Sequence, residues 1–73
     1  MMPNRGLPSM LIDNHGNAID AYDSLREGIK GLRAVCEGDP EARNEVALLV
    51  YDGDGNLLDV LTWTDIYVTE GEL

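Results

Sequence analysis

The stretch "EVALLVY", residues 45–51, constrains the fold most, because it is apolar on both sides of a strand. In a strand, Val46, Leu48 and Val50 would point one way and the residues between them the other way. A strand that is apolar on both sides is usually an interior strand, covered on both faces. One helix can cover only one face of a small sheet. The second face therefore requires the N-terminal segment, the C-terminal segment or a second copy of the chain.

A single helix is predicted between residues 25 and 37. Ser24 followed by Glu27 forms a capping box that starts a helix, and Gly38 followed by Pro40 is typical of a helix end. One face carries apolar side chains at spacings of four, three and four, namely Leu25, Ile29, Leu32 and Cys36.

Two glycines, Gly28 and Gly31, lie inside this predicted helix, where each costs about 1 kcal/mol relative to alanine. Close approach of the helix to a neighbouring element would explain them. The alternative is sequence drift that the fold tolerates. We favour close packing.

Two hairpins flank the helix. "SMLID" and "AIDAY" are joined by "NHGN", and "EVALLVY" and "LLDVLTW" are joined by "DGDGN". Consecutive strands with short turns pair antiparallel. The sequence predicts an α+β fold in the order β-β-α-β-β, with one helix on an antiparallel sheet of four strands, or of five if residues 66–68 add a strand. We expect a tail at residues 1–8, one domain at 9–69 and an acidic tail at 70–73.

The two hairpin loops repeat one pattern, because "DNHGNAID" at residues 13–20 returns as "DGDGNLLD" at residues 52–59. Asp, Gly and Asn at these spacings suit a tight hairpin loop, in which glycine takes the left-handed conformation and aspartate accepts bonds from loop amides. Duplication of a hairpin is one explanation of the repeat. The functional alternative is a calcium loop, whose first ligands would be Asp52, Asp54 and Asn56. Leu57 and Trp63 stand where such a loop needs Gly and Glu, so the hairpin interpretation is favoured.

Composition excludes several classes of function. The net charge of −9 opposes direct binding to nucleic acid and suits either solubility or a basic partner. Cys36 is the only cysteine and His15 the only histidine, so neither a disulfide nor a cysteine-rich zinc site can form within the chain. Cys36 is expected to be buried and inert. We expect no enzyme activity, no metal and no cofactor.

The location and the general type of protein are inferred from absent signals and from size. No secretory signal or membrane span is evident, so a cytoplasmic location is expected. In size and charge the chain resembles the small acidic accessory proteins of bacteria and their phages, some of which inhibit other proteins by binding them. This resemblance involves no motif.

The sequence therefore predicts a non-catalytic protein-binding module, an inhibitor or regulator, that occupies a surface of a larger, basic protein and forms a homodimer. The alternative is a small calcium- or ligand-binding protein that uses the two loops. The candidate partner-binding residues are aromatic and apolar side chains with nearby acids: Leu49, Tyr51, Asp59, Trp63, Asp65 and Tyr67. A basic stripe on the helix is a second candidate docking surface, although an ordinary solvated helix face explains it as well: Arg26, Lys30 and Arg33.

Overall fold

Both hairpins and the helix form as the sequence predicts. The computed structural model describes residues 7–66. In chain order its elements are β1 (Ser9–Ile12), β2 (Ala18–Tyr22), α1 (Leu25–Gly38), the 3-10 helix η2 (Pro40–Asn44), β3 (Ala47–Tyr51) and β4 (Leu57–Leu61).

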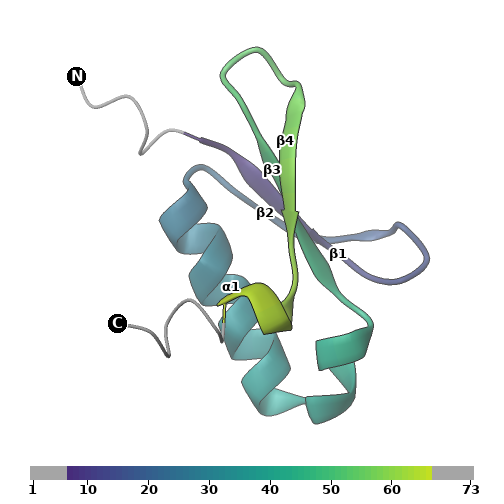
Figure 1. The fold of residues 1–73 in the computed structure, drawn as a ribbon. Helices are drawn as coiled ribbons and strands as arrows, with labels where there is room; N and C mark the ends of the chain where they lie inside the picture. Colours follow the sequence, from purple (N-terminus) through teal and green to yellow (C-terminus); the bar gives the residue numbers. More distant parts are fainter. Residues whose placement is uncertain (1–6, 67–73) are drawn as a thin grey trace.

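The four strands form one antiparallel sheet in the order β2-β1-β3-β4, with α1 packed across one face (Figure 1). The fold is therefore α+β. The first strand of each hairpin lies in the middle of the sheet, and β1 pairs with β3 although α1 and η2 separate them in the sequence. The second strand of each hairpin is an edge strand.

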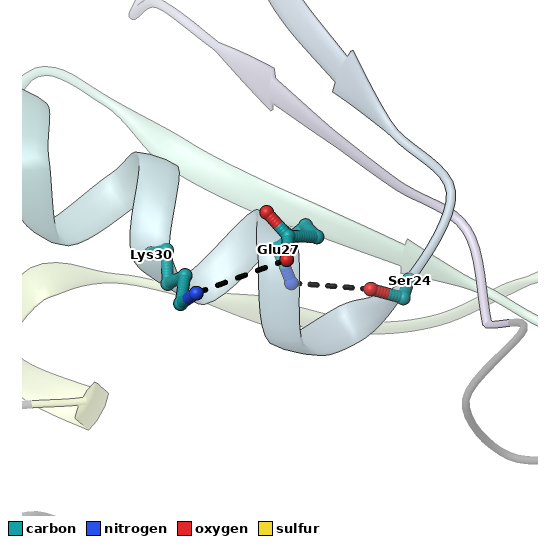
Figure 2. A network of polar contacts seen from close by, with 3 residues as sticks. All are labelled: Ser24, Glu27 and Lys30. Carbon is teal, nitrogen blue, oxygen red and sulfur yellow. Dashed lines mark hydrogen bonds and ion pairs between the residues drawn. The ribbon is translucent and has the colours of Figure 1, made fainter.

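Helix α1 begins at the predicted cap. The Ser24 hydroxyl accepts a hydrogen bond from the Glu27 amide at 3.2 Å, which satisfies one of the amides that a helix start leaves free. Figure 2 shows this bond together with the contact of Glu27 with Lys30, whose Nζ lies 3.9 Å from the Glu27 carboxylate. That ion pair is exposed, so it stabilises the fold by less than about 1 kcal/mol.

Both helix glycines are explained by close packing. A Cβ atom at Gly28 would overlap the Ser9 hydroxyl of β1, and one at Gly31 would overlap the Tyr22 hydroxyl of β2. Ser9 is only 2% exposed and donates from its hydroxyl to the Ser24 carbonyl. The glycines therefore let the start of α1 lie against the β1–β2 hairpin.

The core lies between α1 and the sheet. Leu11, Leu48 and Leu32 are fully buried, and they come from the two central strands and the helix. Cys36 is also fully buried, as predicted. The other buried apolar side chains are Ala42, Val46, Val50 and Ile66.

The connection after α1 is more ordered than predicted. Its residues form η2, where the Asp39 carboxylate accepts from the Glu41 amide at 3.1 Å. Arg43 then reaches back and donates from Nε to the Cys36 carbonyl at 3.0 Å, which satisfies a free acceptor at the end of the helix.

The predicted strand at residues 66–68 is wrong at its first residue. Ile66 lies in a helical turn, residues 63–66, and its amide donates to the Thr62 carbonyl. Thr62 caps this turn, because its amide and hydroxyl both donate to the Asp65 carboxylate. Residues 67 and 68 lie outside the described part, as do the predicted tail at 70–73 and residues 1–6. Pro8, in the predicted N-terminal tail, accepts a bond from the Tyr51 amide.

Candidate functional site: the open face of the sheet

The two hairpin loops have the same structure. In the first loop, Asp13 Oδ1 accepts from the amides of His15 and Asn17, both at 2.9 Å, and Gly16 has a φ of 83°. In the second loop, Asp52 Oδ1 accepts from the amides of Asp54 and Asn56 at 2.8 and 2.9 Å. Gly55 has a φ of 89° there. The repeated pattern thus encodes one turn made twice, in which the left-handed position needs glycine.

The hydrogen bonds in each loop favour the charged form of the first aspartate. They lower the pKa of Asp13, where the Asn17 amide is the largest cause and the His15 amide the next. They also lower the pKa of Asp52, mainly through the Asn56 amide. The turn itself therefore holds the first aspartate of each loop in its charged form.

No group of three or more histidine, cysteine, aspartate or glutamate side chains in residues 7–66 is arranged to hold a metal ion.

The symmetry of the two hairpins extends through their strands. The pairs in the first hairpin are Ser9–Tyr22, Met10–Ala21, Leu11–Asp20 and Ile12–Ala18, and those in the second are Leu48–Leu61, Leu49–Val60, Val50–Asp59 and Tyr51–Leu57. Every pair in the second set stands 39 residues after its counterpart, and the β-bulge falls at the same place in both.

The two hairpins are therefore related by a pseudo-twofold axis. Met10 pairs with Leu49 across the junction of β1 and β3, and these two residues are each other's counterparts in the repeat. The axis consequently runs between Met10 and Leu49, normal to the sheet.

One face of the sheet, which we call the open face, carries no covering element among residues 7–66. Residues paired across a sheet point to the same side, and successive residues point to opposite sides. Because Leu48 and Val50 are buried toward α1, their neighbours on β3 face away from it. Where the bulge adds a residue to each edge strand, Ala18 pairs with Ile12 and Leu57 pairs with Tyr51, so both belong to this face as well. The open face consists of Met10, Ile12, Ala18, Ile19, Ala21, Ala47, Leu49, Tyr51, Leu57, Leu58 and Val60.

The open face is apolar and accessible. Its central members are half-buried, whereas Ile19, Leu58 and Val60 on the edge strands are 47%, 56% and 43% exposed. The row that crosses its middle, Ala21, Met10, Leu49 and Val60, contains no charged side chain. Large apolar residues gathered on one face of a small protein mark an interaction surface more often than scattered ones do.

Both edge strands carry a carboxylate that occupies a backbone amide. Asp20 Oδ1 accepts from the Ala21 amide at 2.9 Å, and Asp59 Oδ1 accepts from the Val60 amide at 2.8 Å. An amide bonded to a neighbouring carboxylate is not offered to another strand. Charged side chains on edge strands are a common protection against edge-to-edge pairing.

The structure separates the predicted partner-binding residues. Leu49 and Tyr51 lie on the open face. Asp59 pairs with buried Val50, so it points to the helix side of the sheet, and Asp65 caps the turn at Thr62. Trp63 is half-buried against the core, with the Arg43 guanidinium 4.7 Å from its ring centroid, so it does not lie on the open face. Tyr67 lies outside the described part.

The three basic residues of the stripe on α1 differ in exposure and in contacts. Lys30 contacts Glu27, Arg33 is half-buried and Arg26 is exposed. This arrangement fits the ordinary helix face that the sequence left open as an explanation.

The structure places the single histidine in a loop and the single cysteine in the core. The His15 amide closes a loop, and the Cys36 thiol is buried among apolar side chains, which raises its pKa. A thiol with a raised pKa is a weak nucleophile at neutral pH.

The sequence indicated that residues 45–51 form a strand that is apolar on both sides, but it did not point to most residues of the open face. Met10, Ile12, Ile19, Leu58 and Val60 were not among the predicted binding residues. The available signal was the run of apolar residues in β1 after Ser9, and the placement of Leu58 and Val60 on either side of Asp59 in β4. This signal identifies the open face only when the pairing of β1 with β3 is known, and no local sequence pattern encodes that pairing.

No protein-family model matches the chain, and no curated protein or solved structure is significantly similar to it. Within residues 7–66, no helix has the length and apolar character needed to span a bilayer.

Proposed function

We propose that this protein is a non-catalytic, cytoplasmic protein-binding module that inhibits or regulates another protein by occupying one of its surfaces. The observation that carries the proposal is the open face. Covering an apolar sheet face stabilises a protein by about 25 cal/mol for each Å² of apolar surface removed from water. A partner that binds to the open face would supply this stabilisation.

The charge of the chain supports a basic partner. The net charge is −9, and the two acidic loops project at different ends of the sheet, away from α1 (Figure 1). A protein with basic groups would be attracted at long range, whereas the phosphates of a nucleic acid would be repelled. We propose a larger, basic protein, such as one whose own groove binds nucleic acid.

The proposal is tested by capture from a lysate of the organism that encodes the chain. The bait is the wild-type chain, a Val60→Lys variant that places a charge on the open face, or an Ala34→Lys variant. Ala34 is exposed on α1, so the control introduces the same charge on a different surface.

The expected result is a protein that wild type and Ala34→Lys retain and Val60→Lys loses, with retention that weakens as salt rises. Equal recovery by all three baits would refute the open face as the binding surface. Binding that does not change with salt would refute the basic character of the partner.

A further inference from the structure

We infer that the open face is covered by a second copy of this chain, with the two sheets stacked face to face around Met10 and Leu49. The inference rests on the proposed function, in which the open face is the binding surface. It adds the identity of one occupant and the geometry of the assembly.

The edges of the sheet are unsuited to association. On β2 and β4, the Asp20 and Asp59 carboxylates hold the amides of Ala21 and Val60, and a strand added there would have to displace them. It would also meet a carboxylate on each edge. Association through the sheet is thereby directed to its face.

The chemistry of the face suits an uncharged occupant. A Lys or Arg side chain from a basic protein would be buried against the row that includes Met10 and Leu49, where no described side chain could pair with it. Burying an unpaired charge costs several kcal/mol. A second copy instead offers the same uncharged, apolar face, as an isologous interface requires.

The area is sufficient for a weak dimer. Four edge-strand side chains are about half exposed and the central ones are half-buried, so the open face offers on the order of 500 Å² per copy, and two copies would bury roughly 1,000 Å². That is near the lower limit for specific interfaces, so we expect a Kd on the order of 10 µM or weaker. Stacked sheets lie about 10 Å apart, which the apolar side chains of the two faces would fill.

The charge gives this dimer a distinctive response to salt. Each copy carries −9, so the dimer carries twice that, −18, and the copies repel each other. Added salt shortens the screening length from about 10 Å at 0.1 M to about 3 Å at 1 M. Dimerisation should therefore strengthen as salt rises, whereas binding to a basic protein should weaken. A second copy and a larger basic partner would therefore compete for the open face, and salt would shift that competition toward the dimer.

The experiment is sedimentation equilibrium of the full chain from 1 µM to 1 mM, in 50 mM and 500 mM NaCl. The proteins compared are wild type, Leu49→Lys at the centre of the face, Val60→Lys at its edge, and the control Ala34→Lys. Val60 is 43% exposed, so its variant should fold even if the half-buried Leu49 position does not tolerate lysine. Circular dichroism establishes folding for each.

The expected result is a mass that rises from 8.0 kDa toward twice that value with concentration, and at lower concentration in the higher salt. Val60→Lys should weaken the association at least tenfold, and Ala34→Lys should leave it close to wild type. A monomer at 1 mM in both salts would overturn the inference, as would a dimer that the face variants leave intact. If the chain is monomeric and capture from the lysate still depends on Val60, the inference fails and the proposed function stands.

Discussion

Substitution of the two helix glycines by alanine should affect stability differently, because only Gly28→Ala should destabilise the fold. Each change gains about 1 kcal/mol from helix propensity, so any difference between the two variants reports packing. At Gly28 the new Cβ would overlap the Ser9 hydroxyl and lie 3.1 Å from Cδ1 of Leu48. Ser9 and Leu48 are buried on the two central strands, so neither can move away easily.

Gly31 has a more adaptable neighbour. Its closest atoms all belong to the outer end of the Tyr22 ring, which is half-buried on an edge strand and can rotate toward solvent. Overpacking costs about 1–3 kcal/mol in a rigid core. After the gain in helix propensity is subtracted, Gly28→Ala should destabilise the fold by up to about 2 kcal/mol, or up to roughly 15 °C in Tm for a domain of this size, and Gly31→Ala should be neutral or stabilising.

The assay is urea unfolding followed by circular dichroism at 2 µM, where the chain should be monomeric. Ser9→Ala, which removes the overlapping hydroxyl, should make Gly28→Ala less costly by about 1 kcal/mol in a double-mutant cycle. The reasoning would be refuted if Gly28→Ala stabilised the fold as much as Gly31→Ala, or if the cycle showed no coupling.

Two further predictions concern ionisable groups. In NMR titrations, the carboxyl groups of Asp13 and Asp52 should titrate at lower pH than in short peptides of the same loops. Because folding lowers the pKa of both carboxyl groups, they stabilise the fold at pH values above the unfolded-state pKa of about 3.9. This stabilisation is lost as the pH falls through the folded-state pKa. Equal titration midpoints in the protein and the peptides would refute the prediction. The Cys36 thiol should react with an aromatic disulfide reagent at pH 8 only in denaturant, and rapid reaction of the native protein would contradict its burial.

The helix and the two turns could be predicted because their signals are local. Ser24 and Glu27 start α1, and Gly28 and Gly31 already indicated a close neighbour. The Asp-x-x-Gly-Asn pattern likewise specifies its turn through bonds between residues at most four apart. Such signals need no knowledge of the rest of the fold.

The pairing of β1 with β3 could not be predicted in the same way, because residues 13–46 separate the two strands. The helical turn after β4 had a local signal that was overlooked. Thr62 and Asp65 have the same spacing as Ser24 and Glu27, and they form the other bond of a capping box, in which the carboxylate accepts from the first residue of the pair. The β-branched residues at 66 and 68 favoured a strand, and the cap outweighed them at Ile66.

The pairing of β1 with β3 and the helical turn after β4 together explain why nothing within residues 7–66 covers one face of the sheet. Each hairpin is followed by a capped helical segment, α1 after β2 and the turn at residues 63–66 after β4. The pseudo-twofold axis is normal to the sheet, and a rotation about such an axis keeps each face of the sheet on its own side. Repeating a strand-strand-helix unit around it must therefore place both helical segments on the same face. The repeated units therefore leave the second face of β3, with Ala47, Leu49 and Tyr51, uncovered, and only something outside these two units can cover it.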